Sequence, residues 1–86
     1  MFVARSAPNP FKNNVNFSFV LPKSGPVSVE IYSTDGRHVK TVVRVAMSAG
    51  EHHVSWSLDQ DTPSGVYFYR VMAGANQSSG KLIRVD

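Results

Sequence analysis

The chain of 86 residues contains no cysteine, which excludes a thiol nucleophile, a disulfide and any Cys-ligated zinc or iron–sulfur centre. It also lacks an apolar run that approaches the ~18 residues of a membrane-spanning helix. Residues 1–4 have neither the basic head nor the long apolar stretch of a signal peptide. We therefore expect the chain to be a fragment of a larger parent, with any export signal upstream.

Charge of one sign is not concentrated anywhere in the chain. Nine Lys and Arg residues and six acidic residues give a net charge of +3, and the cations are scattered singly. A nucleic-acid interface requires cations that cluster on one face, so we expect no nucleic-acid partner. A domain of this length has a modest core and no room for a deep substrate cleft. Without a nucleophile elbow or a glycine-rich phosphate loop, we expect no catalytic residues and no cofactor.

What the sequence does contain is alternation of apolar and polar residues with period two, interrupted by turn residues at short intervals. This pattern predicts an all-β domain, an immunoglobulin-like or fibronectin III-like antiparallel β-sandwich of about seven strands. In the fourth strand Val42 and Val43 are adjacent, so one faces away from the core unless a bulge intervenes. The predicted strands are 2–5, 14–21, 27–32, 38–45, 51–58, 65–72 and 78–85.

The side chains that point into the predicted core follow from the same alternation. The sixth strand is unusual because both of its faces carry apolar residues. We place Tyr67, Tyr69 and Val71 inward, since Arg70 then reaches water. The other inward residues are Val15, Phe17, Phe19, Leu21, Val27, Val29, Ile31, Val54, Trp56 and Leu58.

This assignment leaves apolar side chains on the outside of the sandwich. Val66 and Phe68 then face outward, beside outward residues such as Val42 and Val20. Together with Tyr32, the residues Val66 and Phe68 form a candidate exposed contact patch, because exposed apolar patches often mark interaction surfaces. The alternative is that the rest of the parent protein covers them.

The titratable residues give little support for a metal site. His52 and His53 are neighbours on a strand and point to opposite faces, and His38 adds at most a second ligand across a hairpin. Asp59 and Asp61 share an oxygen-rich loop, but calcium takes six to eight oxygen ligands. We expect surface histidines, a solvated loop and no metal ligands.

Several short motifs occur in a familiar order along nearly the whole chain. In this order they resemble the C-terminal sorting domain of bacterial proteins exported by the type IX secretion system (type A, the Por secretion tail), which is related to the immunoglobulin-like domain of the flagellar hook-capping protein. The motifs are Pro8-Asn9-Pro10-Phe11, Leu21-Pro22, Ile31-Tyr32, Asp35-Gly36-Arg37, Ala49-Gly50-Glu51-His52, Trp56, Ser64-Gly65-Val66-Tyr67-Phe68-Tyr69-Arg70 and Lys81-Leu82-Ile83.

The resemblance implies which residues carry recognition. Residues 1–7 become a linker and residues 8–86 the sorting domain, whose position at the end of the chain favours the sorting family over the hook-capping domain. The loop 59–64 is shorter than the Asp/Gly-rich loop common in the family. The recognition motifs carried over are Pro8, Asn9, Pro10, Gly65, Tyr67, Lys81, Leu82, Ile83 and Val85.

The resemblance also implies a function. The domain is then a non-catalytic signal that directs an upstream cargo domain of the same chain through the periplasm and outer membrane to the cell surface or the medium. Its partners are the secretion translocon and a sortase, and any cleavage falls at or before the entry segment, near residues 1–6. The last strand is a candidate for β-addition. The alternatives are a carbohydrate-binding module that uses Tyr32 with Phe68, although Trp56 lies in phase with the core, and a passive spacer.

Overall fold

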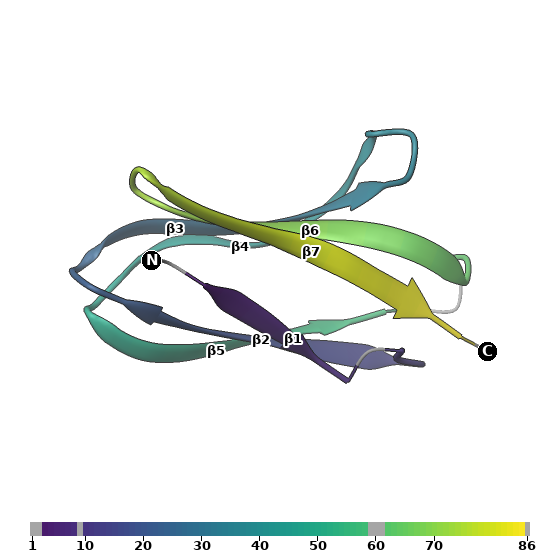
Figure 1. Ribbon diagram of the computed structural model, residues 1–86, viewed down its shortest axis with the longest axis horizontal. Helices are drawn as coiled ribbons and strands as arrows, with labels where there is room; N and C mark the ends of the chain where they lie inside the picture. The colour runs from purple at the N-terminus through teal and green to yellow at the C-terminus, as the bar shows by residue number, and fades with distance from the viewer. Residues whose placement is uncertain (1–2, 9, 59–61, 86) are drawn as a thin grey trace.

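The computed structural model describes residues 3–8, 10–58 and 62–85, and its regular elements are seven β-strands in two antiparallel sheets. Figure 1 shows the sheets as two stacked layers, with the order β1-β2-β5 in one and β4-β3-β6-β7 in the other. The predicted all-β sandwich of about seven strands is therefore confirmed. The strands are β1 (Ala4–Ala7), β2 (Asn14–Leu21), β3 (Gly25–Ser33), β4 (His38–Met47), β5 (Gly50–Ser57), β6 (Gly65–Ala73) and β7 (Asn76–Arg84).

The first strand lies further along the chain than the predicted 2–5. β1 pairs with β2 from Ala4 opposite Phe19 to Ala7 opposite Asn16, so four residues of the segment predicted to be a linker belong to the three-stranded sheet. The pairing places the inward side chain of Ala4 beside the inward Phe19, and Ala4 is buried. The pairing with β2 and the burial of Ala4 hold residues 4–7 in the three-stranded sheet.

The core lies between the two sheets and consists of the side chains that alternate inward. Val15, Phe17, Val29 and Val71 are fully buried, as the alternation predicts. Trp56 is also buried, whereas Val54 and Leu58 pack against the core only half-buried. The aromatic rings of Phe17 and Tyr69, from opposite sheets, contact each other with 5.1 Å between their centroids.

A bulge in β4 resolves the position of its adjacent valines. Val29 pairs with Val43, but the next residue of β3, Glu30, pairs with Thr41, so Val42 is an extra residue on the β4 side. Both Val42 and Val43 are half-buried and pack against the core. Because β4 lies at the end of its sheet, the bulge and the exposed cations of the strand also discourage pairing with another chain.

The two sheets are joined along one side by contacts between β1 and the pair β6–β7. The Ala4 N–H donates to the Ser78 Oγ at 3.0 Å, and the Tyr69 hydroxyl donates to the Ala4 carbonyl at 3.3 Å. The Tyr69 ring crosses β7 at Gly80, its cross-strand partner, where an added Cβ would lie 2.6 Å from the ring. The missing side chain of Gly80 therefore makes room for the aromatic ring that reaches β1.

We predict that Gly80→Ala lowers the free energy of unfolding by about 1–3 kcal/mol, because the new methyl group overlaps a buried ring. Urea unfolding followed by Trp56 fluorescence measures the change. In a Tyr69→Leu background the same substitution should cost much less, and Ser79→Ala, on the adjacent exposed residue, serves as a control. An equal cost of Gly80→Ala in both backgrounds would contradict the explanation.

Candidate functional site

Three of the predicted recognition motifs meet at one end of the sandwich. Residues 10–13 follow β1, residues 62–67 lead into β6, and residues 82–85 end the chain's last strand. The segment after β1 and the end of β7 lie at the same end of the molecule in Figure 1. We call residues 10–13, 62–67 and 82–85 the motif end. Pro8 lies just before it, after a cis Ala7–Pro8 bond, and Asn9 lies outside the described residues.

The main chain of β7 is paired at the motif end. The Phe11 N–H donates to the Ile83 carbonyl at 2.9 Å, and the Val85 N–H donates to the Phe11 carbonyl at 2.8 Å. This parallel bridge covers the edge of the strand that was expected to receive a partner by β-addition. At Ile83 and Val85 that expectation is wrong, because the chain's own Phe11 already takes the place of the added strand.

The aromatic side chains of the motif end pack inside the sandwich. Phe11 and Leu82 are fully buried, and the Trp56 ring lies 6.4 Å from Phe11 and 6.2 Å from Tyr67, centroid to centroid. The Tyr67 hydroxyl donates to the Pro63 carbonyl, which fixes the end of the loop before β6. Tyr67 and Leu82 therefore build the folded end of the domain rather than its surface.

Gly65 opens β6 in a backbone conformation with φ of +139°, where any side chain would be strained. The backbone conformation explains why the motif Gly65-Val66-Tyr67 begins with glycine. The glycine starts the strand, and Tyr67, two residues later, points inward and holds the preceding loop.

Arg84 is a residue of the motif end that the sequence did not single out. Its Nε donates to the Lys12 carbonyl at 2.9 Å and its Nη1 to the Thr62 carbonyl, so one side chain joins two segments that are distant in sequence. The available signal was its phase, because Arg84 lies two residues after the inward Leu82 and therefore points to the same side of β7. A cation in an inward position near a strand end must reach around the end of the sandwich to polar groups.

The outer face of the four-stranded sheet carries the predicted contact patch. Phe68 is 41% exposed and Val66 38% exposed, while Tyr32 is half-buried beside Phe68, its cross-strand partner. Lys81 is exposed on the other side of Phe68.

The expectation that Val20 and Val42 extend this patch is wrong. Val20 lies on β2, in the other sheet, and its exposed side chain is on the opposite outer face of the sandwich. Val42 is drawn against the core by the bulge in β4.

Glu30 departs from the simple alternation on this outer face. Its position is outward, yet the residue is only 8% exposed. The Thr41 hydroxyl donates to Glu30 Oε1 at 2.6 Å, and the His38 Nε2 lies 3.5 Å from Glu30 Oε2. The Tyr32 ring contacts His38 edge-on, and the Arg70 guanidinium lies 5.2 Å from the Tyr32 ring centroid. Polar side chains of β4 and β6 thus cover the Glu30 carboxylate, which the alternation predicted to be exposed.

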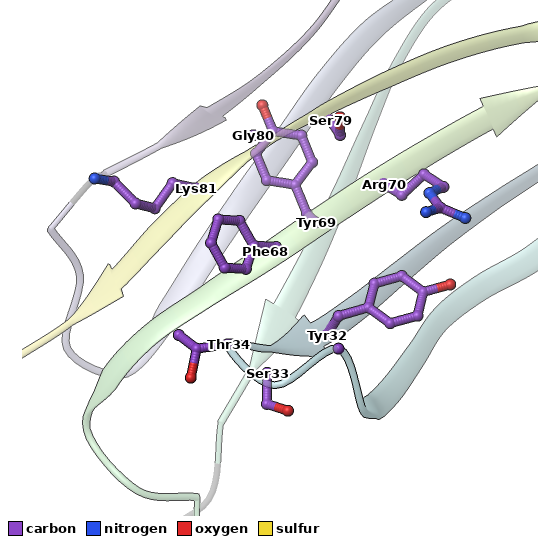
Figure 2. Close-up of a pocket in the computed structure, with 10 residues that line it drawn as sticks. Tyr32, Ser33, Thr34, Phe68, Tyr69, Arg70, Ser79, Gly80 and Lys81 are labelled. Carbon is purple, nitrogen blue, oxygen red and sulfur yellow. The ribbon is translucent and has the colours of Figure 1, made fainter.

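Beside this cluster the outer face is hollowed into a groove of about 470 Å³. Figure 2 shows the Phe68 ring flanked by Lys81 on one side and by Arg70 and Tyr32 on the other. The groove spans the end of β3 with its turn, the middle of β6 and the middle of β7. It is lined by Tyr32, Ser33, Thr34, Gly36, Phe68, Tyr69, Arg70, Ser79, Gly80 and Lys81. We call this feature the outer-face groove.

The turn after β3 forms one wall of the outer-face groove and is held by Asp35. The Ser33 hydroxyl donates to the Asp35 carboxylate, and the Arg37 N–H and guanidinium also face it. These contacts, the Ser33 hydroxyl first, hold the pKa of Asp35 below its usual range. Gly36 takes a positive φ of 84°, which closes the tight turn.

The histidines take separate roles on the surface. The His52 Nε2 lies 2.7 Å from the Ser48 carbonyl, and the His53 Nε2 lies 3.0 Å from Glu51 Oε1. Within residues 3–8, 10–58 and 62–85, no three His, Asp or Glu side chains gather closely enough to hold a metal ion. Asp59 and Asp61, weighed for calcium, lie outside these described residues. The described part of the chain also has no helix long and apolar enough to cross a membrane.

For Asp35 we predict a carboxyl titration midpoint below the ~3.9 of an unfolded chain. Its contribution to the turn is present above that unfolded value and is lost as the pH falls through the lowered folded pKa. Carbon-13 NMR titration measures the midpoint. Ser33→Ala should raise it and Ser79→Ala should not, whereas an unchanged midpoint in Ser33→Ala would exclude the hydroxyl as the main cause.

For Arg84 we predict that Arg84→Met lowers the free energy of unfolding by about 1–2 kcal/mol, because two backbone carbonyls lose a charged donor. Hydrogen exchange should quicken at the amides of Leu58 and Val85, which bond to residues 11–13. Lys23→Met removes an exposed cation in the turn between β2 and β3 and should leave both measurements unchanged. Unaltered exchange at Leu58 and Val85 in Arg84→Met would show that the side chain does not hold the motif end.

The chain has similarities to known proteins. In the solved structures the chain is similar to the CARDB domain of a Pyrococcus furiosus protein, determined in complex with di-metal ions. The identity is 13% and the TM-score 0.50, over 99% of this chain and 86% of that chain, so the likeness shows the fold alone. No curated protein matches the sequence.

The match to a protein family is more informative. Residues 7–85 match the family described as the secretion system C-terminal sorting domain. The matched region starts at the end of β1 and includes all the strands of the motif end and of the outer-face groove. Because the match extends over nearly the whole chain, this protein belongs to the secretion system C-terminal sorting domain family.

Proposed function

We propose that the domain is a non-catalytic C-terminal signal that directs an upstream cargo domain of the same chain through the type IX translocon. A sortase then cleaves the signal domain from the cargo. Family membership marks the protein for export to the cell surface or the medium. The observation that carries the finer proposal is the convergence of three recognition motifs on the motif end, where Phe11, Tyr67 and Leu82 are buried together.

This burial determines how the signal can be read. A receptor cannot contact Tyr67 or Leu82 directly in the folded domain, because both lie inside the sandwich. Tyr67 and Leu82 therefore act by specifying the fold, and the translocon recognises the surface that the fold presents. A signal of this kind is active only after the domain has folded.

The pairing of β1 narrows the place where a sortase can cut. A protease that binds its substrate as an extended segment pairs with the main chain of that segment, so a segment already paired within the domain must first be released. Ala4 is 5% exposed and Ala4–Ala7 pairs along its length with β2. In the described part of the region 1–6, residues 4–6 cannot enter a protease without unfolding of the strand. Cleavage is therefore proposed on the cargo side of Ala4.

The carbohydrate-binding alternative has little support from the aromatic side chains. Trp56 is 6% exposed, and the face of the Tyr32 ring is occupied by the Arg70 guanidinium. A sugar platform uses exposed, coplanar rings, and of the rings in the outer-face groove Phe68 is the most exposed.

The proposal predicts that a fluorescent protein fused in front of this domain, with a periplasmic signal peptide, reaches the surface of a type IX host. Removal of residues 81–86 takes away the buried Leu82 and the bridge to Phe11, so the fusion should remain in the periplasm. Fluorescence that is sensitive to added protease measures surface exposure. Val20→Ser, on the outer face of the other sheet, is the control that should still be exported. Export of a folded reporter after the deletion would refute the proposed signal.

A further inference from the structure

The outer-face groove has a one-sided charge. Two of its lining residues, Arg70 and Lys81, are cations, and none of its lining residues is a carboxylate. Hydroxyl groups of Ser33, Thr34 and Ser79 add polar hydrogen-bonding groups to the lining. This combination favours an anionic ligand group over a cationic or a purely apolar one.

In the described part of the chain, two acidic side chains lie near the Arg70 end of the groove, and both have other partners. Glu30 is the cross-strand partner of Arg70, but its carboxylate is directed towards β4, where it accepts hydrogen bonds from Thr41 and lies 3.5 Å from the His38 Nε2. Asp35 is bound to Ser33 and Arg37 within its own turn. Each carboxylate therefore already has partners, while Arg70 leans over the Tyr32 ring.

The contact between Arg70 and Tyr32 sets up the cation for binding. An aromatic ring orients a guanidinium without neutralising it, because the attraction arises from the ring quadrupole. The five N–H groups of the guanidinium remain suited to a carboxylate, which they can bind in a bidentate manner. On the other side of this pair, the Phe68 ring is 41% exposed and offers an apolar surface.

We propose that the outer-face groove docks an acidic extended segment of a partner protein, with a carboxylate on Arg70 and an apolar side chain on Phe68. The inference rests on the proposed function for the place of this partner, which is in the export machinery. Three adjacent strands span roughly 10 Å, so the groove accepts about three residues of extended chain. A peptide fits better than a sugar, because the Tyr32 ring is covered by Arg70 and contacted by His38.

Binding of a labelled octapeptide of alternating aspartate and leucine tests the chemistry of the groove. Fluorescence anisotropy should show binding that weakens with added salt, and the same peptide with lysine for aspartate should not bind. Phe68→Ser and Arg70→Ser should each weaken binding by about tenfold. The matched controls are Val20→Ser and Arg5→Ser, which remove an exposed apolar residue and a cation from the other outer face and should leave the affinity unchanged.

Three results would overturn the proposal. If the variants on both faces weaken peptide binding equally, or if Phe68→Ser does not weaken it, the peptide binds by unspecific attraction to a basic domain. Binding of a heparin-derived tetrasaccharide at Phe68 and Arg70, with no binding of the acidic peptide, would assign the groove to an anionic sugar instead.

Export of the fluorescent fusion with the double variant Phe68→Ser/Arg70→Ser separates this inference from the proposed function. Circular dichroism and urea unfolding first establish that the variant is folded. Export of the unaltered domain but retention of the folded variant supports the groove. Export of both at the same level overturns its role and leaves the proposed function intact. Failure of the unaltered domain to be exported refutes the proposed function, and the peptide titration then decides on the groove alone.

Discussion

The packing of alternating side chains from β2, β3 and β6 between the two sheets is the interaction on which the rest of the molecule depends. Val15, Phe17, Val29 and Val71 are fully buried there, and the chain has no cysteine that could add a disulfide. Because a strand exposes every second residue, the same burial fixes which side chains remain on the outer faces. A shift of one residue in any of these strands would turn its outward side chains into the core and expose its core residues.

The ends of the sandwich pose a separate problem, which the motif end solves. A small β-sandwich has open ends where core side chains meet water. Here Phe11 fills that space, its main chain bridges to β7, and Arg84 ties the neighbouring segments together. Residues that look like a recognition code in the sequence therefore serve largely to close the fold. The export machinery then reads a surface whose existence depends on them.

The outer face of the four-stranded sheet combines features that core packing does not require. Glu30 is covered by Thr41 and His38, and Arg70 is held over Tyr32, so this part of the surface is ordered by polar contacts. Phe68 remains exposed within it. The opposite outer face, with Val20, provides an internal comparison within the same small domain.

The alternation by itself determined the number of strands, the inward residues of β2, β3 and β6, and the exposure of Phe68 and Val66, because period two is a local property of the chain. The pairing of Phe11 with β7, the reach of Arg84 and the burial of Glu30 depend on residues far apart in sequence, and only the tertiary structure decided them. The grouping of Val20 with Phe68 failed for the same reason. Local periodicity tells which side of a strand a residue occupies, but the strand order decides which side chains share a face.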